Sequence, residues 1–206
     1  MLRLYYADVS ALDPDAFSGA VTDYRREKLS RLRNERSRRQ SLGAELLLRI
    51  ALADCAPEKP WPPHIHLTEN GKPGWDVEGL YFNLSHSGTM AACVIADRPV
   101  GLDLQDACTY SESLARRFFA TEEQAYLAAA ADPDDAFGRV WTMKESYIKA
   151  LGEGLALPLS SFSVVGEGSA SLNAAIWYSR RNGFHFAVCV PGGGDAVPEI
   201  IEKKLP

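Results

Sequence analysis

A carboxylate in the middle of an apolar run is the first candidate for chemistry in this sequence. Residues Val100–Gln105 read V-G-L-D-L-Q, and a strand of this sequence places its larger apolar side chains on one face and Gly101, Asp103 and Gln105 on the other. Burying a carboxylate is expensive unless a cation or a metal ion compensates its charge. Asp103 is therefore either a partnered buried acid or a strand-end residue that faces water, and the pattern alone leaves both open.

A second acid lies on a helix predicted over residues 137–151. Apolar residues four positions before Glu145 and three positions after it place this acid on or beside the inward stripe of the helix. With Lys149, one turn further on, it could form an ordinary i,i+4 pair worth about 0.2–0.5 kcal/mol. The inward placement favours a functional site instead. Asp103 and Glu145 together would make a minimal set of oxygen ligands for Mg²⁺, which uses one or two carboxylates plus waters and substrate phosphates.

Hydroxyl and imidazole side chains follow each other at Ser85-His86-Ser87. Adjacent strand residues point to opposite faces, so Ser85 and His86 are badly placed as a nucleophile and its base, and contacts to phosphate groups suit them better. His64 and His66 would share one strand face. Two histidines without a third nearby ligand are a weak zinc signal, and polar surface residues are the simpler interpretation.

Composition places the chain among ordinary globular proteins. Its 206 residues are 46% hydrophobic and 24% charged, with a net charge of −5, which fits one domain or two small packed halves. The four cysteines show no C-x-x-C spacing and are expected to be reduced. We find no signal peptide or membrane span in the sequence, so we expect a soluble cytoplasmic protein that does not bind membranes.

Positive charge is concentrated in residues 25–39, which hold eight basic and two acidic side chains, a local charge of +6. A solvated helix face is the plainest interpretation. A docking patch for a phosphorylated ligand or an acidic protein is the second. Nucleic acid is a third, but the negative net charge argues against it and no interleaved aromatic residues offer the bases a stacking platform.

The elements that must position these residues follow from periodicity and turn signals. We expect helices over residues 36–53 and 137–151, and another opened by a capping box of Thr121 and Gln124. Strands are expected at residues 64–68, 80–84, 90–96, 100–104, 162–165, 174–178 and 184–190, and a loose tail after Gly192. Helices followed by strands occur twice. The predicted fold is therefore α+β, with two similar halves, residues 1–98 and 99–206, and a ligand cleft between them.

In their order along the chain, several short motifs resemble the surfactin-type 4′-phosphopantetheinyl transferases. The matching stretches are N-L-S-H-S-G at residues 83–88, V-G-L-D-L at 100–104, R-F-F at 117–119, W-T-M-K-E-S-Y-I-K at 141–149 and G-E-G-L at 152–155, with N-G-K-P at 70–73 and L-P-L-S-S-F-S-V at 157–164. Each motif is modest alone, but their joint order and spacing are specific. The resemblance runs from about residue 24 to residue 190 and so covers most of the chain.

This resemblance implies a pseudo-symmetric monomer of two α+β halves with its active site at their junction. The implied reaction is the Mg²⁺-dependent transfer of phosphopantetheine from coenzyme A to a serine hydroxyl of an apo carrier protein, whether a peptidyl, polyketide or fatty acyl carrier, with release of adenosine 3′,5′-bisphosphate. Asp103 and Glu145 match the Mg²⁺ ligands, and Glu145 is also placed to act as, or to orient, the base that deprotonates the serine. Lys149 matches a lysine that contacts the pyrophosphate and assists the leaving group.

Other positions are carried over from the family in the same way. Those that match coenzyme A contacts are Lys28, Arg39, Lys72, Ser85, His86 and Lys144, with Lys72 beside the adenosine portion. Glu123 matches a glutamate near the metal, although its place in a capping turn gives an equally good structural reason.

Gln105 departs from the family pattern, because a second acid often stands two residues after the aspartate. An amide oxygen can still ligate Mg²⁺, directly or through water, but without the charge. We therefore expect retained activity with a weaker metal affinity. The competing interpretation is a non-catalytic module that binds coenzyme A or a carrier protein. Against it stand the acidic and basic residues that the family needs, all of them present: Asp103, Lys144, Glu145 and Lys149.

Overall fold

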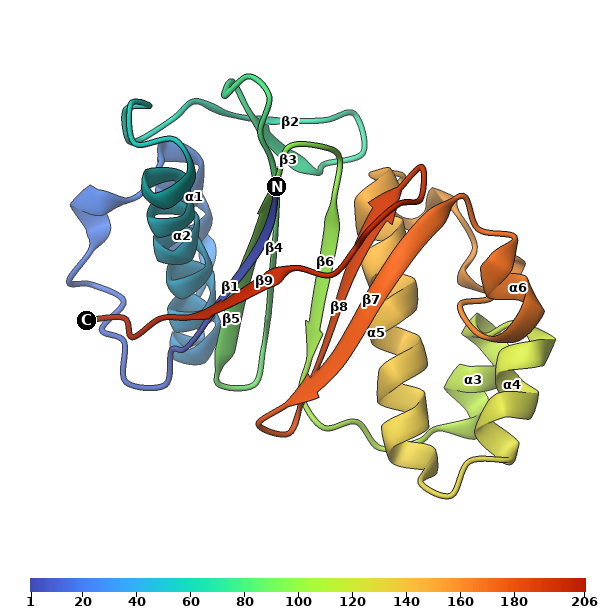
Figure 1. The fold of residues 1–206 in the computed structure, drawn as a ribbon. Helices are drawn as coiled ribbons and strands as arrows, with labels where there is room; N and C mark the ends of the chain where they lie inside the picture. Colours follow the sequence, from blue (N-terminus) through green and yellow to red (C-terminus); the bar gives the residue numbers. More distant parts are fainter.

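The computed structural model describes the backbone of all 206 residues and every side chain except those of Ser18 and Leu155. Leu155, the last residue of the G-E-G-L motif, thus falls outside the described side chains. The chain forms two main sheets, each with one long helix on its outer face (Figure 1). This arrangement confirms the predicted α+β fold.

The first sheet has the strand order β4-β5-β1-β9. β1 (Leu2–Asp8) runs antiparallel to β5 (Met90–Ala96) and parallel to β9 (Glu199–Glu202), and β4 (Tyr81–Ser87) pairs antiparallel with β5. The second sheet has the order β6-β8-β7, all antiparallel, and consists of β6 (Gly101–Gln105), β7 (Ala174–Arg181) and β8 (Phe184–Pro191). A separate hairpin consists of β2 (Ile65–Leu67) and β3 (Pro73–Trp75).

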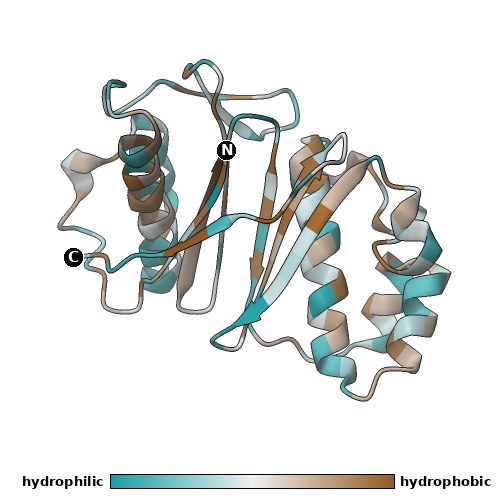
Figure 2. Ribbon diagram, in the orientation of Figure 1, coloured by the Kyte–Doolittle hydropathy of each residue, from teal (hydrophilic) through white to brown (hydrophobic). Residues whose placement is uncertain are grey.

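Three hydrophobic cores fill the layers. α2 (Glu35–Cys55) packs on the outer face of the first sheet, and α5 (Pro133–Leu151) packs on the outer face of the second. The inner faces of the two sheets meet in a third core, where the rings of Tyr6 and Phe186 lie 5.4 Å apart. Figure 2 shows hydrophobic residues along much of α2 and of the strands, whereas the first turns of α2 and the end of β7 are hydrophilic. Among the described residues, no helix is long and apolar enough to cross a membrane.

Shorter elements complete the two halves. α1 (Asp23–Arg31) precedes α2, and α3 (Glu112–Phe118), α4 (Thr121–Ala128) and α6 (Gly166–Ala170) gather beside α5 (Figure 1). Three single 3₁₀ turns occur at Ser18–Ala20, Gly154–Ala156 and Leu159–Ser161.

The two sheets are joined along β4 and β6 by side chains instead of a backbone ladder. Alternate residues of β4 accept hydrogen bonds from alternate backbone N–H groups at β6: Leu102 N donates to Asn83 Oδ1 (2.8 Å), Leu104 N to Ser85 Oγ (3.1 Å) and Asp106 N to Ser87 Oγ (3.0 Å). We call this row the β4–β6 seam. Its two-residue period is that of a strand, so three polar side chains on one face of β4 satisfy two backbone donors of β6 and that of Asp106 just after it.

Replacing Asn83 by leucine tests the seam. Asn83→Leu leaves the buried Leu102 N–H without an acceptor, and we expect a loss of about 1–3 kcal/mol in the free energy of unfolding. Asn173→Leu, at an exposed asparagine in the loop before β7, should stay within about 0.5 kcal/mol of the parent. Urea unfolding of the three proteins measures the difference, and equal midpoints for both variants would show that the seam does not contribute to stability.

Most of the elements predicted from periodicity are confirmed, with small shifts of their ends. The helix expected over residues 36–53 is Glu35–Cys55, and the strand expected at residues 90–96 has those bounds. The helix expected from residue 137 begins earlier, because Asp132 Oδ1 accepts a hydrogen bond from Asp135 N and Pro133 occupies the first turn. The D-P-D-D stretch at residues 132–135 thus begins α5.

Three expectations about local structure are wrong. Residues 162–165 form no strand, since side chains satisfy their backbone: Lys144 Nζ donates to Phe162 O (2.6 Å) and Val164 N donates to Glu123 Oε1 (2.8 Å). The cap of α4 is Ala120, whose N–H donates to Glu123 Oε2 (2.8 Å), and not a Thr121–Gln124 box. The tail after Gly192 is not loose throughout, because it returns to the first sheet as β9.

Candidate active site

Close packing of α5 on β6 brings the site residues together. A Cβ atom at Gly101 would lie 2.1 Å from the carbonyl oxygen of Ser146 and 2.3 Å from the nitrogen of Ala150. Only glycine allows this approach of helix and strand. The polar face of β6, which carries Asp103, is thereby set against the stretch of α5 that carries Glu145 and Lys149.

Asp103 is a buried acid with a cationic partner. Its exposed fraction is 5%. Lys149 Nζ donates to Asp103 Oδ1 at 2.6 Å, and Ser85 Oγ donates to the same oxygen at 3.0 Å. Lys149 Nζ also lies 3.2 Å from Ser85 Oγ, so strand β4, strand β6 and helix α5 each contribute one member to this triangle. Of the two interpretations of Asp103, the partnered one is therefore correct.

Glu145 is a second acid near Asp103, and the positive charge of Lys149 does not fully compensate its carboxylate. It is half-buried one turn before Lys149, and it lines a cavity of about 330 Å³ together with Lys72, Asn83 and Lys149. Burial raises the pKa of the Glu145 carboxyl, and the negative charge of Asp103 raises it further, while Lys149 partly offsets both effects. A raised pKa on a carboxyl that lines a cavity is typical of a group that accepts or donates protons.

The donor set fits a Mg²⁺ ion. Asp103 Oδ1 is engaged by Lys149 and Ser85, whereas the buried Asp103 Oδ2 has no hydrogen-bond partner among the described residues. A buried carboxylate oxygen without a partner is costly, and a cation between Asp103 and Glu145 would remove that cost. Gln105 follows two residues later on the same face of β6 and is half-buried.

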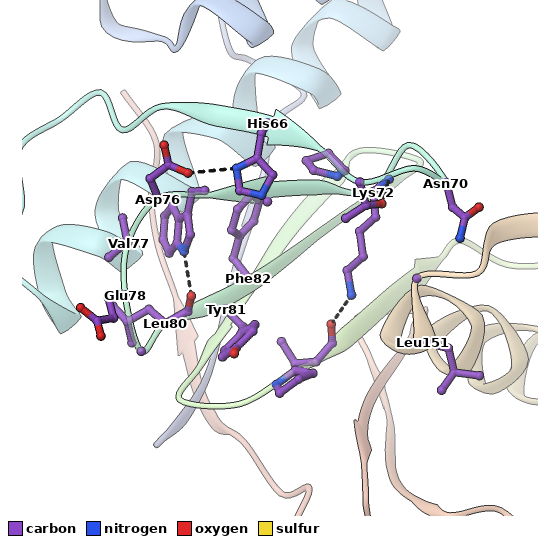
Figure 3. Close-up of a pocket in the computed structure, with 18 of the residues that line it drawn as sticks. His66, Asn70, Lys72, Asp76, Val77, Glu78, Leu80, Tyr81, Phe82 and Leu151 are labelled. Carbon is purple, nitrogen blue, oxygen red and sulfur yellow. Dashed lines mark hydrogen bonds and ion pairs between the residues drawn. The ribbon is translucent and has the colours of Figure 1, made fainter.

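Lys72 stands between two cavities. It lines both the 330 Å³ cavity and a larger one of about 810 Å³ beneath the β2–β3 hairpin. Its ammonium group donates to Val100 O (3.1 Å) and Ala150 O (3.2 Å), and Figure 3 draws one of these two contacts. Burial lowers the pKa of Lys72 to about 8. A cation held between two carbonyl oxygens, with no carboxylate, keeps its charge available for an anionic ligand.

His86 lies on the opposite face of β4 from Ser85, as the alternation predicts. It is an exposed residue, yet its surroundings lower the pKa of the imidazole to about 4 through desolvation and then through the positive charges of Lys28, Arg25 and Lys149. Three cations around one imidazole mark a place where negative charge is stabilised. The structure thus brings Lys28 to the neighbourhood of His86.

Most other cations of residues 25–39 are already paired. Arg25 is buried and donates to Glu45 Oε2 (3.0 Å), and most of the remaining arginines contact nearby carboxylates. Arg39 donates to Ser10 O (2.7 Å) and to its i−4 neighbour Glu35, so the structure does not direct it toward His86. Among the described side chains, Lys28 has no ion-pair partner within 4.0 Å.

Lys144 and Glu123 form a pair of their own. The Lys144 side chain is 1% exposed and that of Glu123 is 0% exposed, and Lys144 Nζ donates to both carboxylate oxygens at 2.6 and 2.8 Å. The ammonium group also lies 4.1 Å from the centre of the Phe162 ring. These contacts tie α4, α5 and the segment after the last 3₁₀ turn together and give both residues a structural role inside the protein. The structure does not group them with Asp103.

Sequence reasoning gave no role to Asn83 and Ser87, which form the seam with Ser85. A signal was available in the alternation N-x-S-x-S along a strand, because three polar residues on one face of a buried strand require partners. Arg36 and Gln40 were also missed. Both donate to Gly88 O, at 3.0 and 2.8 Å, and so fix the turn that follows Ser87.

Comparison with known proteins adds an independent finding. The model of the 4′-phosphopantetheinyl transferase superfamily matches residues 99–192. A 4′-phosphopantetheinyl transferase of Bacillus subtilis is 36% identical over 160 residues, 76% of this chain and 71% of that protein, and the transferase Sfp of B. subtilis strain 168 is 33% identical over the same shares. The transferase gsp of Aneurinibacillus migulanus is 33% identical over 147 residues, 70% of this chain and 62% of that protein.

Proposed function

The chain belongs to the 4′-phosphopantetheinyl transferase superfamily and is a transferase, and on this premise we propose that it moves the phosphopantetheine arm of coenzyme A to a serine hydroxyl of an apo carrier protein. One observation carries the proposal: Asp103, Glu145, Lys149 and Ser85 converge at the β4–β6 seam beside a cavity, with one oxygen of Asp103 left for a metal ion.

The bound metal belongs to the proposal as well. Asp103 and Glu145 would hold Mg²⁺, and Gln105 would add an amide oxygen directly or through water. When bound there, Mg²⁺ would neutralise negative charge on the pyrophosphate oxygens of coenzyme A.

The chain's own residues supply the rest of the chemistry. The serine Oγ forms a bond to the phosphorus that carries the pantetheine arm, and the bond from that phosphorus to the bridging oxygen breaks. The serine proton passes to Glu145, whose raised pKa makes its carboxylate a stronger proton acceptor than an ordinary glutamate. The electron pair leaves with adenosine 3′,5′-bisphosphate, and the Lys149 ammonium neutralises the charge that develops on it.

Two adjoining cavities suit a long anionic substrate. Glu145 and Lys149 line the 330 Å³ cavity, and Lys72 lines both this cavity and the 810 Å³ cavity. We place the pyrophosphate of coenzyme A at Lys149 and Ser85, its adenosine portion beside Lys72, and a further phosphate at His86 and Lys28. The cationic surroundings of His86 support this placement.

The lowered pKa of Lys72 predicts a pH effect on coenzyme A binding. Lys72 is mostly charged below pH 8 and mostly neutral above it. The KM for coenzyme A should therefore rise by about fivefold as the pH is raised through 8, because the loss of one ion pair costs about 1 kcal/mol of binding free energy. Lys72→Arg keeps its charge over this range and should flatten the KM profile. A steady-state pH series for both proteins measures it, and parallel profiles would exclude Lys72 as the group responsible.

The direct test is the intact mass of an apo peptidyl carrier protein after incubation with coenzyme A, Mg²⁺ and this protein. A gain of one phosphopantetheine unit that EDTA abolishes would support the proposal. No gain across peptidyl, acyl and polyketide carriers, despite measurable coenzyme A binding, would favour the non-catalytic binding module instead.

We further propose that the protein acts as a monomer in the cytoplasm, with residues 1–98 and 99–206 as its two halves. Ser85, Asp103 and Lys149 contact one another within a single chain, so their grouping does not need a second copy. The four cysteines are free thiols, which is typical of a reducing compartment. β9 is an exception to the division at residue 98, because it pairs with β1 of the first half.

A further inference from the structure

The β2–β3 hairpin sorts its side chains onto two faces. Ile65 is paired with Trp75 and His66 with Gly74, and Asp76 N donates to His64 O (3.4 Å), which continues the same register. Trp75 points inward and is 7% exposed. His64, His66 and Asp76 consequently share the outward face, with Gly74 between them.

The three polar side chains on this face converge on one point. His64 Nδ1 lies 2.9 Å from Asp76 Oδ2, and His66 Nδ1 lies 3.2 Å from Asp76 Oδ1 (Figure 3 shows the second contact). One ligand atom from each residue lies within 4.8 Å of the others. A Cβ atom at Gly74 would stand 2.7 Å from His66 Nε2, so the missing side chain makes the room that the His66 ring occupies.

The geometry points to a binding site for a divalent transition-metal ion, with Zn²⁺ as the best match, formed by His64, His66 and Asp76. Bonds of 2.0–2.2 Å in a tetrahedral Zn²⁺ site place neighbouring ligand atoms about 3.3–3.6 Å apart. The two distances between imidazole nitrogen and carboxylate oxygen, 2.9 and 3.2 Å, are somewhat shorter than this. The ion therefore needs only small rotations of exposed side chains, after which Asp76 exchanges its contacts with the two imidazole rings for a metal bond.

The ligand types decide which metals fit. Imidazole suits Zn²⁺, Ni²⁺ and Cu²⁺, whereas Mg²⁺ and Ca²⁺ select oxygen ligands. The site is therefore chemically distinct from Asp103 and Glu145. Three protein ligands leave one position of a tetrahedral ion for water or a ligand atom. His66 and Asp76 line the 810 Å³ cavity, so the ion would form part of its wall.

The hairpin holds the ligands in place before any metal binds. Trp75 Nε1 donates to Leu80 O (2.9 Å), and the Trp75 ring lies 4.6 Å from that of Phe82 on β4. The strand that presents Asp76 is thus anchored by a buried ring next to it. Preorganised ligands bind a metal more tightly because less conformational freedom is lost on binding.

Zinc titration in excess Mg²⁺ tests the proposal, because Mg²⁺ then occupies the site of Asp103 and Glu145. We expect calorimetry on the EDTA-treated, dialysed protein to show one equivalent of Zn²⁺ bound, and Co²⁺ in its place to give the visible absorption of a nitrogen–oxygen site. His64→Asn, His66→Asn and Asp76→Asn should each weaken Zn²⁺ binding by at least about tenfold, the least that losing a ligand should cost. All three residues are exposed, so the variants should fold.

Two controls separate this site from others. Glu78→Gln removes an exposed charge that lines the same cavity and should leave Zn²⁺ affinity unchanged. Asp103→Asn should also leave it unchanged, so failure of the proposed transferase chemistry would not affect this result. Absence of Zn²⁺ binding to the parent protein, or equal affinity in His66→Asn, would overturn the proposal.

Discussion

Glu145→Gln should lower kcat for phosphopantetheinyl transfer by about 10²–10⁴-fold, the contribution expected of a general base, with any loss of metal affinity added to it. The amide keeps the shape of the side chain but neither accepts the serine proton nor contributes charge to the metal. Only desolvation and the charges of Asp103 and Lys149 act on the Glu145 carboxyl, with no side-chain hydrogen bond among the described residues, so stability should change little. Intact-mass progress curves of an apo carrier protein at saturating coenzyme A and Mg²⁺ measure the loss.

The matched control for this variant is Glu153→Gln, an exposed glutamate just beyond the end of α5. It makes the same change of charge and should retain the parent rate. The pH profile provides a second criterion. Because the pKa of Glu145 is raised, the parent should lose activity as the pH falls through that raised value, and Glu145→Gln should lack this acidic limb. A variant as active as the parent would remove Glu145 from the chemistry.

Lys144→Met should cost about 3–5 kcal/mol of unfolding free energy, the penalty for leaving one charge of a buried pair without its partner. Glu123 would remain at 0% exposure, with hydrogen bonds only from Ala120 N and Val164 N. Phe162 O would lose its donor as well. Urea unfolding of the variant and the parent measures the effect.

A surface ion pair gives the control for Lys144→Met. Lys203 donates to Asp54 Oδ2 at 3.1 Å with both side chains partly exposed, and Lys203→Met should cost about 0–1 kcal/mol. The double variant Lys144→Met/Glu123→Leu should recover only part of the loss, since Glu123 also accepts two backbone N–H groups. If Lys144→Met instead kept its stability and raised the KM for coenzyme A, Lys144 would be a substrate contact, as the resemblance implies.

The sequence predicted the position of a site residue correctly where the geometry of a single strand or helix decides which face carries it. The alternation of β6 placed Asp103 on the polar face, and the period of α5 placed Glu145 and Lys149 one turn apart on its inward side. These are local consequences of strand and helix geometry. The 2.6 Å contact between Lys149 Nζ and Asp103 Oδ1 could not be predicted from either pattern, because it depends on the tight contact of Gly101 with α5.

Contacts between distant segments were not predictable. Asp76, which completes the group with His64 and His66, comes ten or more residues later, and only the register of β2 with β3 brings it back. The strand character of β9 depends wholly on β1, far away in the sequence. Residues 162–165 have the composition of a strand, yet Glu123 and Lys144 take the hydrogen bonds that a neighbouring strand would have made.

The return of β9 to the first sheet determines when that sheet can be completed during synthesis. Arg3 Nε donates to Glu199 Oε2 (2.8 Å) across 196 positions of the sequence, and Tyr6 OH donates to Glu202 Oε2 (3.0 Å) across the same separation. A chain growing from its N-terminus presents β1 as an unpaired edge until residues 199–202 have been made. The edge of β1 that pairs with β9 therefore stays exposed throughout the synthesis of the residues between these two strands, and during that interval it is most open to aggregation.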